Sequence, residues 1–356
     1  MPRDVREWTA NELLRDMLIR QRRWLVNVEN GLSLQVLRQL QRLEQELAGK
    51  IVTLLASEDP QTWLTGARQA RILADMQVSI NEMFARAQDG VEATISEAAK
   101  AEADVLRSRL AVALAKLPEA MPIYSVPQKM LAEVVQNYLP QNPAAGAKPV
   151  IDRLSGLSAA AGKRVQRVFA DAVARGDGAE AVARAVRRAI GPKSITAHEA
   201  TVLARTQLQR VANDVSRTFY HQNRDIVTKV QVLETLDKRT CLQCAQLHGR
   251  VFPIDEAPVH PLHPQCRGFT TPVVGSWRDL GIPPDKATPD IRRLFDGKPA
   301  PVQGYEEWLR GQSDAVQRQV LGASRFDAWA KGKAELADFA TDRRVLTVEE
   351  YRRRAA

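Results

Sequence analysis

The stretch that decides the fold lies in the second half of the chain, where residues 236–267 read LDKRTCLQCAQLHGRVFPIDEAPVHPLHPQCR. It contains all three cysteines of the chain, Cys241, Cys244 and Cys266. Together with His263 they form a Cys-x2-Cys pair, an insert of 18 residues and a His-x2-Cys pair. Two ligand pairs on tight turns, separated by an insert of hairpin size, predict a tetrahedral zinc site with three thiolates and one imidazole.

Zinc suits this donor set because it accepts mixed sulfur and nitrogen ligands without redox chemistry. Four protein ligands would saturate the ion and leave no position for an activated water. We therefore expect a structural ion that holds together a loop-rich segment with too much proline to form its own core, and we expect no catalysis there.

Two other interpretations of the three cysteines stay open. The cluster could be structural without a metal, or the Cys-x2-Cys pair could be a redox centre. An odd number of cysteines in a chain without an export signal disfavours a disulfide framework. A redox pair normally opens a helix in a thioredoxin-like context, which is absent here. His248 and His260 are the nearby substitutes for His263, and each is more typical of a surface or turn histidine.

The first 120 residues predict a helical, coiled-coil-like region, because apolar residues recur at spacings of three and four. One stripe consists of Val36, Leu40, Leu43, Leu47, Ile51 and Leu54. Asp59-Pro60 predicts the cap and first turn of a second helix that ends near Gly90. The stripe of this helix consists of Ile72, Met76, Ile80 and Met83. A third helix is expected from Val91 to Leu114.

Residues 121–149 predict a Pro-rich linker with room for one short helix, Met130–Tyr138. Small-residue helices follow at 158–175 and 179–190. Thr196 and Glu199 have the spacing of a capping box, which predicts the start of another helix. Its apolar face consists of Ala204, Leu208, Val211, Val215 and Phe219.

Beyond residue 225 the pattern changes to short strands. Val230 and Val232 alternate with polar neighbours, residues 249–253 suggest a hairpin, and residues 270–274 suggest another strand. Helical patterns return at 305–320 and 326–339.

We therefore predict a mainly α (α+β) fold in four parts. They are an N-terminal helical region (1–120), the Pro-rich linker (121–149), a central helical domain that ends in a small β-hairpin zinc-knuckle-like unit (150–275), and a helical C-terminal extension (276–356).

Composition narrows the function only broadly. The net charge of +9 suits a partner rich in phosphate or carboxylate, such as DNA, but the basic residues are spread along the chain and equally suit solvated helix faces. No apolar run is long enough to span a membrane, and the polar N-terminus lacks the pattern of a signal peptide, so we expect synthesis in a cytoplasm.

Four ordered motifs in this chain resemble the phage Mu F-like head-morphogenesis family. They are Ala204-Arg205-Thr206-Gln207, the Asp-x-Arg-Thr-Cys-x2-Cys turn at 237–244, the Leu-x-Gly-x2-Phe segment at 247–252, and His-Pro-x-Cys-Arg at 263–267. The resemblance covers about residues 150–275. The segments 305–312 and 320–325 are similar to an extension that follows the domain in some members.

The resemblance implies a set of motif residues beside the four metal ligands. They are Arg205, Thr206, Asp237, Arg239, Thr240, Gly249, Pro264 and Arg267. In this chain Gln207 stands where the family has Glu, and Gly268 stands where the family has a last cysteine. The carboxylate of Asp237 can accept backbone N–H bonds, and Arg239 or Arg267 can pair with a nearby carboxylate; ordinary turn chemistry explains these residues better than substrate contact.

The resemblance also implies a function. Family members are minor capsid proteins that take part in procapsid assembly, so we expect a structural component of the phage head, made in the host cytoplasm. The expected partners are the portal protein and the major capsid or scaffold protein, with packaged DNA as a further partner and no membrane or small-molecule substrate.

Two alternatives are a sequence-independent DNA-binding module and a zinc nuclease of the His-Asn-His kind or a toxin-type enzyme. No histidine follows His263, and the last 80 residues contain no nucleophile constellation or phosphate loop. We therefore expect a protein that is not an enzyme.

Overall fold

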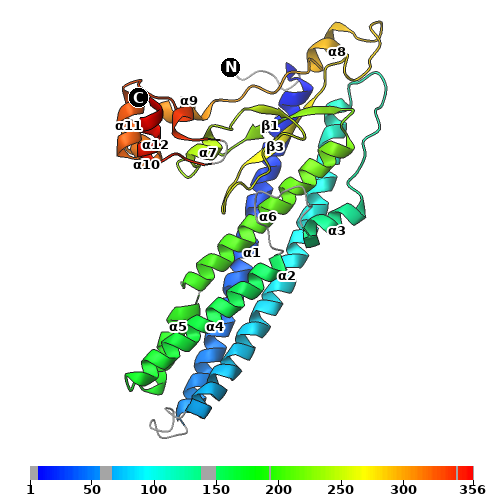
Figure 1. The fold of residues 1–356 in the computed structure, drawn as a ribbon. Coiled ribbons are helices and arrows are strands. Elements are labelled where there is room, and N and C mark those ends of the chain that lie inside the picture. The colour runs from blue at the N-terminus through cyan, green and yellow to red at the C-terminus, as the bar shows by residue number, and fades with distance from the viewer. Residues whose placement is uncertain (1–6, 57–65, 138–149, 192–193, 342–343, 356) are drawn as a thin grey trace. The chain divides into compact units, whose positions relative to one another are not determined.

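The computed structural model of the chain describes residues 7–56, 66–137, 150–191, 194–341 and 344–355. These ranges are mostly helical and contain a three-stranded antiparallel sheet, as the sequence predicts (Figure 1). No helix in them combines the length and apolar character that a membrane span requires.

The chain divides into two compact units, each built from separate stretches of sequence. One unit combines residues 24–100 with 129–211, and the other combines residues 1–23, 101–128 and 212–356. The four-part division expected from the sequence stays a prediction.

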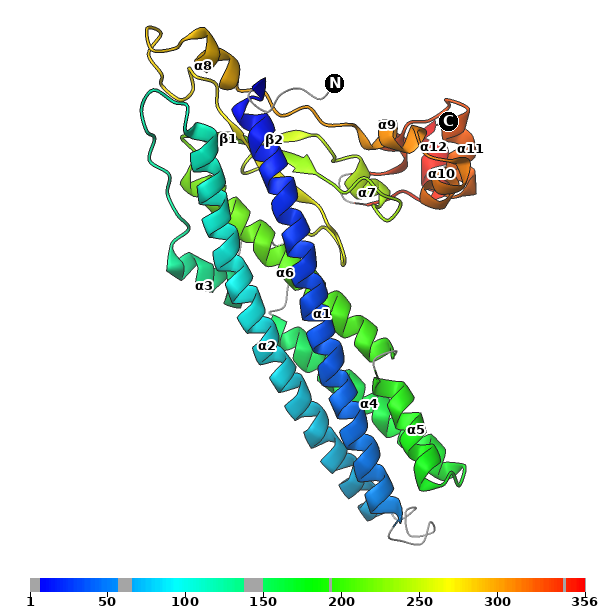
Figure 2. The same cartoon turned by 180° about the vertical axis from the view of Figure 1, so that it is seen from behind.

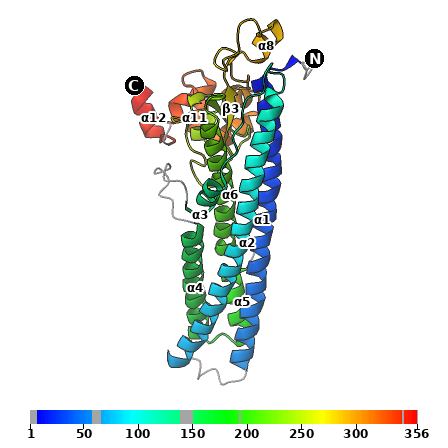
Figure 3. The ribbon, with the colours of Figure 1, turned by 90° about the vertical axis from the view of Figure 1, so that its right-hand side faces the viewer.

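The unit of residues 24–100 and 129–211 is a helical bundle. It contains parts of α1 (Ala10–Ala56), α2 (Gly66–Leu114) and α6 (Ile195–Gln222), together with α4 (Val150–Ala174) and α5 (Ala179–Ile190). Figures 2 and 3 show α4 and α5 beside this part of α1 and α2. The Arg164 guanidinium on α4 makes two hydrogen bonds to the Glu199 carboxylate on α6, at 3.0 and 2.8 Å.

The predicted apolar stripes form the core of this bundle. Buried residues include Val36, Leu40, Leu43, Leu47 and Ile51 of α1 and Ile72, Met76, Ile80 and Met83 of α2. The predicted helix end near Gly90 is wrong, because α2 continues to Leu114. Val91 and Ile95 extend its buried stripe without a break, and one internal glycine costs a helix only about 1 kcal/mol. The predicted cap at Asp59-Pro60 lies outside the described residues.

The predicted capping box at Thr196 is also wrong. The helix α6 begins one residue earlier, and the Ser194 hydroxyl accepts the backbone N–H of Ala197 at 3.2 Å. Thr196 and Glu199 both bind Arg164 instead. Since Ser194 already caps an early N–H group, these two side chains are free to join α6 to α4. The predicted apolar face of α6 is confirmed, because Ala204, Leu208, Val211, Val215 and Phe219 are all buried.

The other unit contains the sheet, in the order β2-β1-β3. The central strand β1 (Val227–Leu233) pairs antiparallel with β2 (Val251–Pro253) and β3 (Phe269–Val274). Strands were expected at these places, and the segment 249–253 supplies β2, whose partner is β1. Asn11 of α1 anchors the end of β3, because its side chain accepts the Val274 N–H at 2.8 Å and donates to the Val274 carbonyl at 3.2 Å.

The described residues also contain several short helices. α3 (Gln128–Asn137) matches the helix expected in the Pro-rich segment, and α8 (Pro289–Leu294), which was not expected, begins at the cap Thr288. The C-terminal part contains α9 (Tyr305–Arg310), α10 (Asp314–Leu321), α11 (Ala323–Ala330), the 3-10 helix η4 (Leu336–Phe339) and α12 (Val348–Ala355).

The helical pattern expected over 305–320 is confirmed and is divided into two helices, because the chain breaks between α9 and α10. The side-chain amide of Gln317, which is buried, donates to the carbonyls of Leu309, Arg310 and Gln312. These bonds satisfy carbonyl groups that the end of α9 would otherwise leave without partners. The pattern expected over 326–339 is likewise divided, since α11 ends before Gly332, whose φ is 66°.

Two leucines of α1 test the bundle core with the same chemical change. Leu47 is fully buried, whereas Leu34 is 54% exposed. We expect Leu47→Ala to lower the free energy of unfolding by about 2–5 kcal/mol, through lost burial and a residual cavity. Leu34→Ala should change it by less than about 1 kcal/mol. Chemical denaturation followed by circular dichroism measures both; equal losses would contradict the assigned core face.

Candidate metal centre

The Cys-x2-Cys pair lies on a one-turn helix, α7 (Leu242–Ala245). Cys241 is its N-cap, and the Cys241 carbonyl accepts the N–H of Ala245 at 2.8 Å. This closed turn brings both thiols to the same side of the chain. Cys244 is buried, and Cys241 is half-buried.

His263 joins this pair from the second predicted turn. Its Nε2 lies 3.2 Å from the Sγ of Cys241 and 3.3 Å from the Sγ of Cys244. Its Nδ1 lies 2.9 Å from the carbonyl oxygen of Pro264, which can only accept a hydrogen bond. In the neutral ring, the proton is therefore on Nδ1 and Nε2 is left as a lone-pair donor, the tautomer that a metal ligand needs.

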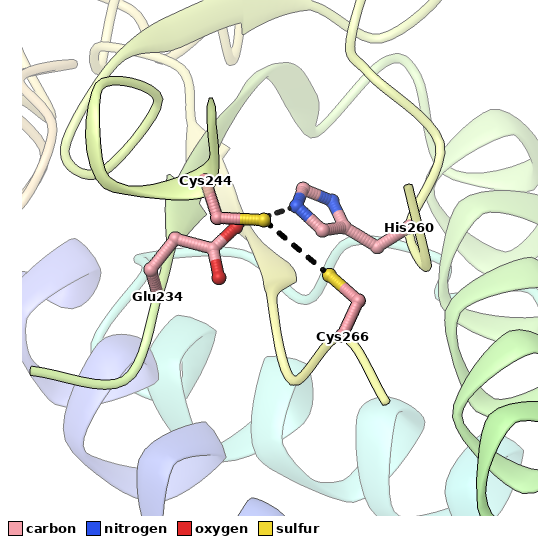
Figure 4. A group of neighbouring side chains, drawn as sticks. All are labelled: Glu234, Cys244, His260 and Cys266. Carbon is pink, nitrogen blue, oxygen red and sulfur yellow. Dashed lines mark hydrogen bonds and ion pairs between the residues drawn. The ribbon is translucent and has the colours of Figure 1, made fainter. Parts of the chain in front are cut away.

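Cys266 lies in the connection between β2 and β3, and its sulfur atom is 3.6 Å from the sulfur atom of Cys244. Cys244 therefore belongs to two groups of mutually close ligand atoms. One consists of Cys241, Cys244 and His263, and the other of Glu234, Cys244, His260 and Cys266. Figure 4 shows the second group, with the side chains of Glu234, His260 and Cys266 around Cys244.

The second group was not predicted, and the expectation that His260 is a surface or turn histidine is wrong. His260 is buried, and its Nε2 lies 2.7 Å from Oε1 of the buried Glu234. Although burial opposes it, this contact raises the pKa of His260. His248 is half-buried, and its Nδ1 accepts the backbone N–H of Glu234 at 2.9 Å, so it orients the carboxylate-bearing residue and joins neither group.

Strand register explains why Glu234 enters the cluster. Leu233 at the end of β1 pairs with Phe269 at the start of β3, so Glu234 and Gly268 lie opposite each other just beyond the sheet. A Cβ atom at Gly268 would overlap the Glu234 carboxylate and the His260 ring. The departure from the family pattern at Gly268 therefore has a structural counterpart, because a carboxylate and an imidazole occupy the space that a side chain there would need.

The spacing of the donors suits a tetrahedral metal ion. Zn–S bonds of about 2.3 Å place two sulfur ligands about 3.8 Å apart, close to the 3.6 Å between Cys244 and Cys266. The structure thus brings all four predicted ligands into one cluster, although they do not form a single mutually close group. Instead, Cys241 and His263 meet Cys244 in one group and Cys266 meets it in the other. This Glu/Cys/His cluster could hold a metal ion.

The thiols differ in their protonation because they share hydrogen bonds. The thiol of Cys244 donates hydrogen bonds to the sulfur atoms of Cys241 and Cys266. The bond to Cys241, together with a hydrogen bond from His263, lowers the pKa of Cys241 to about 4. A hydrogen bond from Cys244 lowers the pKa of Cys266 to about 6, whereas both contacts raise the pKa of Cys244. The contact with Cys241 raises the pKa of His263 to about 9. At neutral pH two thiolates are therefore present, and metal binding must displace protons from Cys244 and His263.

A salt bridge fixes the base of the cysteine turn. Arg267 makes two hydrogen bonds of 2.6 Å to the Asp237 carboxylate, which also accepts the backbone N–H of Arg239 at 2.9 Å. Although burial opposes it, these bonds lower the pKa of Asp237 to about 2. The Thr240 hydroxyl lies 3.4 Å from Arg267 and also bonds the Thr235 carbonyl. The expectations that Asp237 accepts a backbone N–H bond and that Arg267 pairs with a nearby carboxylate are thus confirmed. The Arg239 side chain is exposed, and its Nε lies 3.5 Å from the same carboxylate.

The C-terminal helices pack against the outer side of α7. Leu242 and Ala245 belong to a buried hydrophobic cluster with Tyr305, Leu309, Leu321, Phe326, Trp329, Ala334, Leu336, Phe339, Ala340 and Tyr351. The Tyr305 hydroxyl donates to the carbonyl of Asp237 at 2.7 Å. The sequence gave no reason to assign Tyr305 to this site, because 68 residues separate it from Asp237.

The remaining motif residues have structural roles at separate places. Arg205 and Thr206 lie on α6 and join neither ligand group; Arg205 donates to the Ser33 hydroxyl at 2.9 Å, and Thr206 to the Val202 carbonyl at 2.7 Å. Gln207 is buried, and neither of its amide atoms has a partner among the described residues. Gly249 adopts a φ of 82° in the turn before β2, a conformation that favours glycine.

Comparison with models of protein families gave a match that includes the cysteine turn. Residues 163–271 match the model described as phage Mu protein F like protein. Over these residues the chain is similar to the phage Mu F-like family. The match includes α6, the cysteine turn and all six residues of the two ligand groups, and it confirms the resemblance drawn from the four motifs. This similarity suggests a phage head morphogenesis protein. Comparisons with curated proteins and with solved structures gave no match.

The Asp237 salt bridge predicts a defined pH dependence of stability. Its folded pKa of about 2 lies below the ordinary 3.8, so the stabilisation is fully present above about pH 4 and is lost as the pH falls towards 2. Asp237→Asn should lower the free energy of unfolding at pH 7 by on the order of 1–3 kcal/mol, because Arg267 loses its partner. The difference from wild type should shrink below pH 4 in urea titrations. The exposed control Asp285→Asn should show neither effect; a difference that is constant down to pH 2 would contradict the assignment.

Proposed function

We propose that this phage Mu F-like protein is a minor structural component of a bacteriophage head that acts in procapsid assembly, near the portal and the packaged DNA. The family match over residues 163–271 carries this proposal. Its partners would be the portal protein and the major capsid or scaffold protein.

We assign the metal a structural role. Zinc held by Cys241, Cys244, His263 and Cys266 would tie two turns of a loop-rich segment together, with an apparent binding free energy on the order of 10 kcal/mol available for folding. All described members of the cluster except Cys241 and His263 are buried. Four protein ligands would leave the ion no position for an activated water, which supports a non-enzymatic role.

The virion test is direct. We expect mass spectrometry of purified particles to detect the protein at low copy number. An amber mutation in its gene should reduce the yield of filled heads, and a suppressor host should restore them. Purified particles that lack the protein would contradict the proposal.

A second candidate function is sequence-independent DNA binding, favoured by the helix α5. One face of α5 is buried through Val182, Val186 and Ile190, and the other exposes the arginines 184, 187 and 188. Arg184 and Arg187 have acidic neighbours at 3.4 and 3.9 Å, but such exposed ion pairs are weak and yield readily to phosphates. This basic face is compatible with a head protein that contacts packaged DNA.

Replacing the three arginines at 184, 187 and 188 with Gln tests this candidate. Each lost phosphate contact should reduce the slope of log affinity against log salt by about 0.9, so the triple variant should reduce it by up to about 2.7. Fluorescence anisotropy with a random duplex measures the slope. Replacing the exposed Lys298, Lys331 and Lys333 with Gln is the matched control for net charge. Equal slopes for wild type and both variants would reject α5 as a DNA-binding surface.

A further inference from the structure

The cluster around Cys244 contains more metal donors than one ion can use. The two ligand groups together contain six donors, namely Glu234, Cys241, Cys244, His260, His263 and Cys266. A tetrahedral ion takes four of them. If the predicted set of four binds one zinc ion, Glu234 and His260 are left over beside it.

Glu234 and His260 are buried to an unusual degree for residues that bind no metal. Their side chains are only 2% and 1% exposed, and their contact of 2.7 Å lies directly beside Cys244 and Cys266. Burying a carboxylate and an imidazole is costly unless both are paired or bind a metal.

The donor count fits two ions. Two tetrahedral ions that share two thiolates need six donors in all, with two donors counted for both ions. Cys244 already belongs to both groups, and Cys266 is both a member of the second group and the fourth ligand predicted for the first ion. Three thiolates and one carboxylate carry four negative charges, which two divalent cations neutralise. A buried cluster favours neutrality, and one cation would leave an excess of negative charge.

We infer that Glu234, Cys244, His260 and Cys266 form a second metal site, so that the knuckle binds two zinc-class divalent ions bridged by the thiolates of Cys244 and Cys266. The inference rests on the zinc site assigned above, whose outer ligands are Cys241 and His263. The second ion takes the place of the proton between Glu234 and His260. Binding would separate their two ligand atoms by roughly half an ångström, to the spacing of neighbouring ligands on one ion.

Counting the metal in the full-length chain tests this inference. Apoprotein is prepared with a strong chelator and titrated with zinc, and the bound metal is measured by elemental analysis after gel filtration. We expect two zinc ions per chain in wild type and one in Glu234→Gln/His260→Gln. The matched control Glu256→Gln/His198→Gln changes the same residue types at exposed positions and should keep two.

The zinc count distinguishes a failure of the second metal site from a failure of the proposed structural zinc. One zinc ion in both wild type and the Glu234→Gln/His260→Gln variant would overturn the second site and leave the first intact. Two ions in that variant would overturn the assignment of its ligands. No zinc in wild type would overturn both the second site and the structural zinc of the proposed function.

A cobalt titration of the wild-type chain decides the matter even if the buried variant fails to fold. We expect the thiolate-to-cobalt absorption to rise up to two equivalents. The electron paramagnetic resonance signal should grow with the first equivalent and fall with the second, because bridging thiolates couple the two spins. Absorption that saturates at one equivalent would overturn the inference.

Discussion

The segment that carries the cysteine turn depends on the balance of charge in the buried cluster around Cys244. Three sulfur atoms, two imidazoles and a carboxylate meet within a small volume, where unbalanced charge is strongly disfavoured. Hydrogen bonds partly balance this charge without metal, because Cys244 and His263 retain protons while Cys241 and Cys266 lose theirs. A divalent ion bound there would replace those protons and strengthen the same arrangement.

Two further sets of interactions hold the ligands in place. The pairing of β1 with β3 fixes Glu234 opposite Gly268, and the Asn213 amide donates to the Gly268 carbonyl at 3.2 Å. On the other side, Arg267 and Tyr305 bind the side chain and backbone of Asp237. The site is therefore supported by α6, the sheet and the C-terminal helices together, which is typical of a well-oriented ligand set.

Local patterns predicted most of the helices correctly, and the four spaced residues expected to bind metal lie in one cluster. The apolar stripes of α1, α2 and α6 were readable because helical periodicity is strong in long amphipathic segments. Gly90 misled the prediction because a single glycine is only a weak helix breaker when the stripe continues across it. Thr196 misled it because two short polar side chains, Ser194 and Thr196, competed for the same role and tertiary contact with Arg164 decided between them.

Glu234, His260 and Tyr305 could not be assigned to the site from the sequence, because strand register and tertiary packing place them there. The same packing has a consequence for subcloning and proteolysis. A fragment that stops after β3 would uncover Leu242 and Ala245, which the C-terminal helices normally shield from water. Such a truncated chain would expose a hydrophobic patch on its cysteine turn. Self-association through that patch would compete with the binding of a partner protein.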